Sequence, residues 1–287
     1  MRASPIVLTL AALLVLPSTS VAQRDRYDSP VDGDSTCRAI WREFGRIMNG
    51  RARAVHCEER EIGTRPRSEL IDVDGGFRGG VSIKGAQRND VRIRLVVQAQ
   101  GDDVADAREL ARQVSLDLSR SVLSPDIPRI RNDDWRRDRR FVAATIVIDA
   151  PVESNVRARV EHAPMDIENL RGRIDVSGEH GPVDLRNVGG DVRARVAHGP
   201  LTVTLSGKQF QGAGLDAFAQ HGPLTVRLPR DFNADIEIGA EHGPLDVDFP
   251  VTLTRFDRSS IQTKLGAGGP RIRAIAQHGP MSLRMER

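Results

Sequence analysis

Six of the seven histidines stand in a repeated His-Gly-Pro phrase, and regularly spaced imidazoles can ligate metal ions. The strict copies begin at His180, His198, His221, His242 and His278, and His162-Ala163-Pro164 is a sixth copy with Ala in place of Gly. Carboxylates accompany several copies: Glu161, Glu179 and Glu241 immediately precede a histidine, and Asp166, Asp184 and Asp246 follow four residues later. If the copies stack, they form rows of imidazole and carboxylate, which could bind zinc or copper.

A structural role for the same histidines is the favoured interpretation. If strand alternation continues into the turn, each His shares the parity of the apolar residues four and six positions before it and points inward. Stacked, partly buried imidazoles would have to stay mostly neutral, which predicts a loss of stability below pH ~6. A Glu-His pair converges on one ion only if the turn twists it, because adjacent strand residues face opposite sides. Metal binding therefore stays open as the alternative.

The spacing of the copies predicts a stacked repeat. Successive histidines are 18, 18, 23, 21 and 36 residues apart, and a period near 20 is typical of solenoids. The residues on both sides of each copy alternate between apolar and polar, as in strands with one buried face. A charged residue stands five positions before each histidine: Arg157, Asp175, Arg193, Asp216, Glu237 and Arg273. One rung is thus strand, tight turn, strand, turn, which predicts an all-β β-solenoid, or alternatively an antiparallel β-meander.

Glycine and proline mark the turns of each rung. In His-Gly-Pro we expect Gly to supply backbone angles that other residues avoid, while Pro fixes its own φ. A second turn closes each rung at Arg171-Gly172, Gly189-Gly190 and Gly268-Gly269-Pro270. The 36-residue gap, filled by Pro250 to Gly269, is long enough for an extra rung that lacks the histidine.

The part before the clear repeats contains strands and one helix. Strands are predicted at 70–73, 81–84, 91–98 and 141–148, with Gly-rich or Asn-Asp turns between the first three. Asp102-Asp103 offers an N-cap to an amphipathic helix at about 103–118. We therefore expect one β-strand-repeat domain over 63–287, with the helix docking on the sheet or capping it.

The first residues have the pattern of a secretory signal peptide. Ile6 to Leu16 is apolar, Arg2 precedes it, and Ser20-Val21-Ala22 suits cleavage before Gln23. Residues 1–22 are thus predicted to be removed, and the polar residues 23–36 to form a flexible leader. No later segment has the ~20 apolar residues of a membrane-spanning helix. The expected location is the periplasm, the cell surface or the medium.

The two cysteines, Cys37 and Cys57, are expected to form a disulfide that closes an N-terminal cap over 37–62. In an exported chain such a loop of about 20 residues is worth roughly 3 kcal/mol. A metal site from both cysteines and His56 is the alternative, but it lacks a fourth ligand at a usual spacing.

Composition and missing motifs argue against several functions. The net charge is only +3, and the densest basic stretch, Arg129 to Arg140, also contains three aspartates, so nucleic-acid binding is not expected. No nucleophile elbow, zincin motif, phosphate-binding loop or Cys-x-x-Cys occurs, and no cofactor is expected. A carbohydrate-active enzyme with an acidic cleft from Asp175, Asp184 and Asp216 is a further alternative, which rests on fold analogy alone.

Four features together resemble a known family: Cys57-Glu58-Glu59-Arg60-Glu61, the Gly-rich turn at 75–80, a helix after Val91 to Gln98, and the repeated rungs. The resemblance is to an exported bacterial β-strand-repeat family of unknown function, often labelled "putative adhesin". It implies a β-solenoid-like fold without known catalytic residues. Members typically place Asn-Gly or Ser-Gly at the turn, which favours the structural role of His. We expect a non-enzymatic envelope or surface scaffold whose partner is a glycan, a polyanion or a protein.

Overall fold

The structure is a computed structural model that describes residues 54–130, 140–249, 255–256 and 259–286. The expected signal peptide, leader and Cys37 lie outside these residues, so the disulfide and the cap stay predictions. Within them, no helix has the length and apolar character needed to cross a membrane.

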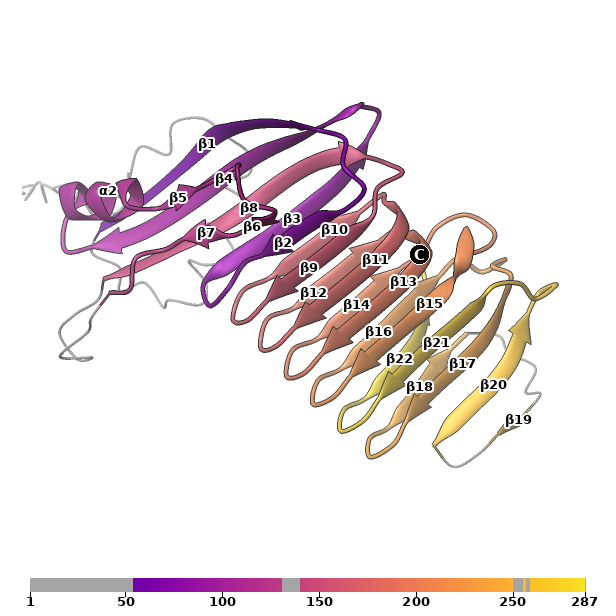
Figure 1. Ribbon diagram of the computed structural model, residues 1–287. Helices are drawn as coiled ribbons and strands as arrows, with labels where there is room; N and C mark the ends of the chain where they lie inside the picture. Colours follow the sequence, from indigo (N-terminus) through magenta and orange to yellow (C-terminus); the bar gives the residue numbers. More distant parts are fainter. Residues whose placement is uncertain (1–53, 131–139, 250–254, 257–258, 287) are drawn as a thin grey trace, which may run out of the picture.

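Two large sheets face each other and build the all-β fold (Figure 1). Sheet A has the order β1 (Ala54–Pro66), β4 (Asp90–Gly101), β8 (Phe141–Pro151), β3 (Gly79–Ala86), β10 (Met165–Glu168), β12 (Val183–Arg186), β14 (Leu201–Thr204), β16 (Leu224–Leu228), β22 (Met281–Met285), β18 (Leu245–Asp248). Sheet B has the order β19 (Arg255–Phe256), β20 (Ser260–Leu265), β17 (Ala234–Ala240), β21 (Arg271–Ala276), β15 (Gly212–Ala219), β13 (Gly189–Val196), β11 (Arg171–Gly178), β9 (Val156–Val160), β2 (Ile71–Asp74), β6 (Val122–Leu123). A small third sheet pairs β5 (Ser115–Leu116) with β7 (Pro125–Asp126).

The repeats form a stack in which the chain alternates between the sheets. Six strands of sheet B (β9, β11, β13, β15, β17 and β21) each lead through a His-Gly-Pro or His-Ala-Pro turn into a strand of sheet A, and equivalent strands of these rungs pair in parallel. The antiparallel meander is therefore wrong for the repeats. Antiparallel pairing is confined to β1, β4 and β8 at one end and to β17, β20 and β19 at the other, and to the small β5–β7 pair.

Equivalent inward residues of successive rungs fill the space between the sheets. Ile174 pairs in register with Val192 on the next strand of sheet B, and Leu185 pairs with Val203 in sheet A. All four are at most 1% exposed. Burying a side chain of this size contributes about 1.5–3 kcal/mol, so the period-2 pattern of the sequence accounts for the core.

The last rung does not follow chain order. Strands β21 and β22, yellow in Figure 1, lie between β15 and β17 in sheet B and between β16 and β18 in sheet A. The predicted extra rung in the 36-residue gap is wrong, because β20 turns back and pairs antiparallel with β17. Because β20 occupies the outer edge of β17, the chain returns and places β21 and β22 between the rung of His221 and the rung of His242.

The strands predicted before the repeats are present as β2, β3, β4 and β8. The predicted helix is present but shorter than 103–118: α2 spans Val104–Arg112, and Asp103 caps it by accepting a hydrogen bond from the Asp106 backbone N–H. The chain then leaves the helix because Ser115 and Leu116 pair with β7. Residues 54–62 of the expected cap lie in β1, which extends sheet A next to β4.

Candidate functional site

Each His-Gly-Pro turn stacks on the turn of the neighbouring rung. The backbone N–H of His198 donates to the carbonyl of Glu179 at 2.6 Å, and that of Leu201 donates to Pro223 at 2.9 Å. Proline removes only a donor that points out of this pattern, while its carbonyl still accepts. The turns therefore continue the hydrogen-bonded register of the two sheets across the corner.

Glycine is needed in this turn for close approach, not for unusual backbone angles. None of the turn glycines has a positive φ, so that expectation was wrong. A Cβ on Gly199 would lie 2.1 Å from the carbonyl oxygen of Gly181 in the preceding rung. The first copy, with Ala163, stacks on the Gly-rich turn between β2 and β3 and not on another His-Gly-Pro turn, since the Glu161 backbone N–H donates to the Gly76 carbonyl at 3.2 Å. Positive φ occurs in the second turn instead, at Gly172 (147°) and Gly190 (101°).

All six repeat imidazoles lie in one row along the corner. Neighbouring ring centroids are 4.4–5.0 Å apart and the ring planes differ by 7–20°. The order along the row is His162, His180, His198, His221, His278 and His242. Phe77, which is 56% exposed, lies 4.5 Å from His162 and adds a seventh ring. The predicted stacking is thus present.

The predicted inward direction of the histidines is wrong, since all six are exposed. In the third rung Val196 and Gly199 are buried, and the two residues between them, Ala197 and His198, are not. The turn therefore contains one residue more than strict alternation allows, and the extra residue moves the imidazole to the solvent side. Because the imidazoles are exposed, the histidine ladder is not partly buried, which was the basis of the predicted loss of stability at acid pH.

The three aspartates of the metal hypothesis are held by arginines: Asp166 and Asp184 by Arg186, and Asp246 by Arg284. Arg186 donates to Asp184 at 3.1 Å and forms a short hydrogen bond with Asp166. Burial raises the pKa of Asp166, against the effect of Arg186. Among the imidazoles of the row, His180 has a carboxylate nearby, with its Nδ1 4.0 Å from Glu179 Oε2. In the described part of the chain, no three His, Cys, Asp or Glu side chains are placed to hold a metal ion.

The outward charged residues of sheet B form a ladder that alternates in sign. Across neighbouring strands the order is Asp72, Arg157, Asp175, Arg193, Asp216, Arg273 and Glu237. Arg157 lies 3.3 Å from Asp72, and Arg273 lies 3.1 Å from Asp216 and 3.4 Å from Glu237. Sequence order hides this alternation because Arg273 comes after Glu237 in the chain. Such partners make the ladder a solvated, self-neutralising surface.

The three aspartates of the enzyme hypothesis do not share a cleft. Asp175 and Asp216 lie on sheet B in the charge ladder, whereas Asp184 lies on sheet A beside Arg186. Two carboxylates on one substrate bond require separations of about 5–10 Å across an open cleft. Carboxylates on two different sheets, each next to arginine, do not supply that arrangement.

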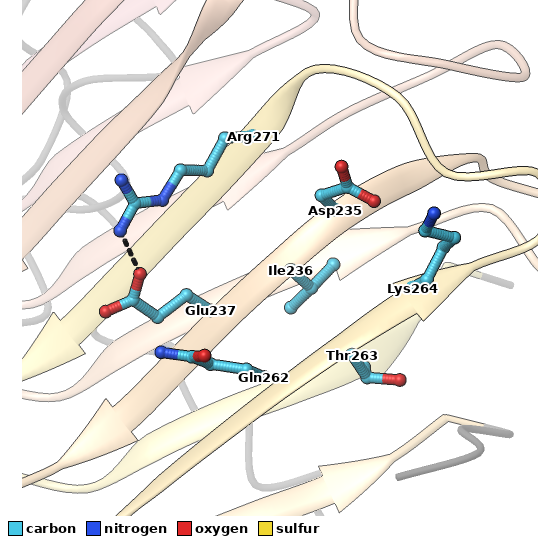
Figure 2. A pocket seen from close by; sticks show the side chains of 7 residues that line it. All are labelled: Asp235, Ile236, Glu237, Gln262, Thr263, Lys264 and Arg271. Atoms are coloured by element: carbon cyan, nitrogen blue, oxygen red, sulfur yellow. Dashed lines mark hydrogen bonds and ion pairs between the residues drawn. The ribbon is translucent and has the colours of Figure 1, made fainter. Parts of the chain in front are cut away.

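A shallow depression lies on sheet B, where β17 is flanked by β20 and β21 (Figure 2). Seven residues of β17, β20 and β21 line it: Asp235, Ile236, Glu237, Gln262, Thr263, Lys264 and Arg271. Arg271 donates to Glu237, and this hydrogen bond raises the pKa of the Arg271 guanidinium. Two acids and two cations balance one another here, so the depression has no net attraction for an anion or a cation.

No family model matches the chain, and no curated protein matches it. Several solved structures are similar in fold. One is described as a putative cell adhesion protein from Clostridium sporogenes, with 11% identity, TM-score 0.44, and 81% of this chain and 100% of that chain covered. Another is a putative adhesin from Parabacteroides merdae, with 13% identity, TM-score 0.39, and coverages of 80% and 96%. A third is a putative adhesin from Bacteroides fragilis, with 11% identity, TM-score 0.33, and coverages of 80% and 97%.

These neighbours carry the same label as the family that the sequence resembles.

Proposed function

We propose that this chain is a non-enzymatic, exported β-solenoid scaffold that binds an extended partner at the cell envelope or cell surface. The observation that carries the proposal is the exposed row of six imidazoles, one from each rung, at 4.4–5.0 Å spacing. Stacked repeats present the same kind of group at a fixed spacing, and such surfaces suit long partners more than small substrates.

Export is supported by the signal-peptide pattern of residues 1–22. Cleavage before Gln23 would release a mature chain in an oxidising compartment, where Cys37 and Cys57 would pair. Mass spectrometry of the protein secreted by a bacterial host tests both points. We expect an N-terminus at Gln23 and a mass two hydrogens below that of the reduced chain. Retention of residues 1–22 in the folded product would contradict export.

The alternatives require arrangements that differ from those observed. A metal ion between two stacked imidazoles would need ring nitrogens about 2.0–2.1 Å from the metal, and parallel rings must rotate to converge in that way. A carbohydrate-active enzyme would need a carboxylate pair on one face. Both alternatives would therefore need side chains in other positions than those observed, whereas display to a partner uses the row of imidazoles unchanged.

The test is binding by the purified mature chain to an array of polysaccharides and envelope proteins, followed by analysis of the bound polymer. We expect saturable binding to at least one class and unchanged polymer length after prolonged incubation. Shortening of a polymer that stops in Asp184→Asn would establish an enzyme instead. Calorimetric zinc or copper binding that is lost when all six histidines become Asn would place the chain among metal-binding proteins.

A further inference from the structure

The inserted last rung brings three similar rungs together. In both sheets the order of strands places β13–β14, β15–β16 and β21–β22 next to one another, and we call these the central rungs. The rungs on either side begin with β11 and β17. Chain order would have put the β17–β18 rung, with its acidic residues, between the second and third of the central rungs.

The central rungs lack the acidic residues that flank the imidazole row elsewhere. Before the histidine, they have Ala197, Gln220 and Gln277, where the other rungs have Glu161, Glu179 and Glu241. After the turn, they have hydroxyls at Thr202, Thr225 and Ser282, where the other rungs have Asp166, Asp184 and Asp246. The same three rungs are thus neutral both at the residue before the histidine and at the second residue after the proline. One continuous area of the corner therefore has no carboxylate at these two positions.

We call this area the central patch and define it by its imidazoles and hydroxyls: His198, His221, His278, Thr202, Thr225 and Ser282. The three hydroxyl residues are partly exposed, and each pairs in register with the next across β14, β16 and β22. Their side chains face the same side of sheet A, because equivalent strand positions share a face. The patch is therefore a line of imidazoles beside a parallel line of hydroxyls.

Two arginines that take part in no ion pair within the described ranges border the central patch. Arg227 follows Thr225 by two residues, is exposed, and takes part in no ion pair within the described ranges. Arg195, on the sheet B side of the corner, is likewise exposed and has no ion pair there. Arg284 differs, since its guanidinium lies 2.5 Å from Asp246 and 3.8 Å from Asp248. Two guanidinium groups thus stay available to an outside anion.

We propose that the central patch docks a linear anionic polysaccharide and holds it more tightly as the pH falls. This inference rests on the proposed function and names its partner. Hydroxyls and neutral imidazoles can both donate and accept hydrogen bonds, as a sugar's hydroxyls require. Guanidinium pairs with carboxylate or sulfate in a bidentate manner, which supplies the charged part of the recognition. A polymer lying along the row would meet an imidazole and a hydroxyl in each central rung, and Arg195 or Arg227 in two of them.

The pH dependence follows from the groups that surround each imidazole. His221 stacks between His198 and His278, and the outer members of these three stack on His180 and His242. The glutamates that precede a histidine lie outside the central rungs: Glu179 and Glu241 belong to the two flanking rungs, and Glu161 belongs to the rung beyond β11. Imidazole gains a proton in the mildly acidic range, and neighbouring charges in the row repel. A bound polyanion relieves that repulsion, so protonation and binding promote each other.

The experiment measures binding of dextran sulfate to the mature chain at pH 5.5 and pH 7.5, with neutral dextran and polyphosphate as comparison polymers. We expect dextran sulfate to bind at least about tenfold more tightly at pH 5.5, and added salt to weaken it. The triple change His198→Asn, His221→Asn and His278→Asn should remove most of the pH dependence. Arg227→Ala should weaken binding severalfold at both pH values.

Matched controls use residues outside the patch. His162→Asn removes one imidazole beside Glu161, and Arg173→Ala removes an exposed arginine that lies 3.6 Å from Asp191. Both should bind dextran sulfate as the parent does. Circular dichroism and urea unfolding verify that every variant folds, and Arg227→Ala remains informative if the triple variant does not.

Each outcome bears on one of the two proposals. Equal binding by the parent and the triple variant, or equal loss in the control variants, would overturn the central patch as the site. Polyphosphate binding as tight as that of dextran sulfate would overturn the polysaccharide assignment, because recognition would then depend on the charge of the polymer and not on its sugar hydroxyls. If another envelope partner from the array binds and no anionic polysaccharide does, this inference fails while the proposed function stands.

Discussion

Arg273 Nη1 lies 3.1 Å from Asp216 Oδ1, although 57 residues separate the two along the chain. The pair joins β15 to β21, the strand that enters the stack out of chain order. It also completes the alternating charge ladder, since Arg273 separates Asp216 from Glu237.

Reversal of this charge should destabilise the stack. Arg273→Glu places a carboxylate between Asp216 and Glu237, and we expect the free energy of unfolding to fall by about 1 kcal/mol at low salt. Arg195→Glu is the matched control, because its cross-strand neighbours Ser177 and Phe218 are uncharged. Urea denaturation should show a loss for the first variant that shrinks in high salt, and little change for the second. Equal losses would mean that the ladder contributes nothing specific.

Close packing of the turns predicts a strong effect at one glycine. Gly199→Ala would place a methyl group 2.1 Å from the Gly181 carbonyl oxygen, so the turns must separate. We expect a loss of about 2–4 kcal/mol in thermal or urea unfolding. Ala163→Gly at the first copy should cost only about 0.5–1 kcal/mol, through added freedom of the unfolded chain. Similar costs for the two changes would show that the rungs do not meet at this turn as described.

The second turn is held by an asparagine ladder. Asn187 Nδ2 donates to Asn169 Oδ1 at 2.6 Å and Asn187 Oδ1 accepts from Ser206 Oγ at 2.7 Å, while both asparagines have positive φ (49° and 57°). Asn187→Ala loses the hydrogen bonds and strains the backbone, for an expected cost of about 2 kcal/mol. Asn187→Gly keeps the backbone and should cost less. If Gly is at least as harmful as Ala, the left-handed backbone at Asn187 is not a source of strain in the Ala variant.

Arg60 is predicted to fix helix α2 to sheet A. Its Nη1 donates to the Val114 carbonyl and its Nη2 to the Ala111 carbonyl, both at 2.7 Å, and Glu58 holds the guanidinium. Arg60→Ala leaves carbonyls at the end of the helix without this donor, and we expect a loss of about 1–3 kcal/mol. Hydrogen exchange should show faster opening of Leu110 and Ala111 than of the repeat strands. Unchanged exchange in α2 would contradict the role.

Glu58 is expected to account for part of the loss of folding stability at acid pH. Although burial raises the pKa of this carboxyl, the hydrogen bonds with Arg60 and His56 outweigh burial and lower it. The folded pKa then lies below the unfolded one, so the stabilisation is present above the unfolded pKa and is lost as the pH falls through the folded value. In Glu58→Gln we expect lower stability at pH 7 and a flatter decline below pH ~4.3, the usual pKa of Glu. Glu109→Gln, in an exposed pair with Arg112, should follow the parent's pH curve.

The sequence predicted the inward residues well, because burial of one strand face imposes a period of two whatever the neighbouring strand is. Val156, Ile174 and Val192 stack as expected, and the helix begins at its Asp103 cap. The direction of the histidines was not predictable from this period, since one extra residue in a turn reverses the face. The role of Gly199 was equally hidden, because it depends on the distance to another rung.

The amino-acid sequence by itself determined that this chain makes repeated strands with alternating faces, joined by turns that carry histidine. Only the tertiary structure decided which rungs are neighbours. Backbone groups at a strand edge are chemically alike, so local sequence does not say which edge receives a later strand. Pairing of β20 with β17 leaves β21 a place beside β15, and this one choice puts His278 between His221 and His242. The alternating ladder and the carboxylate-free central patch both follow from it.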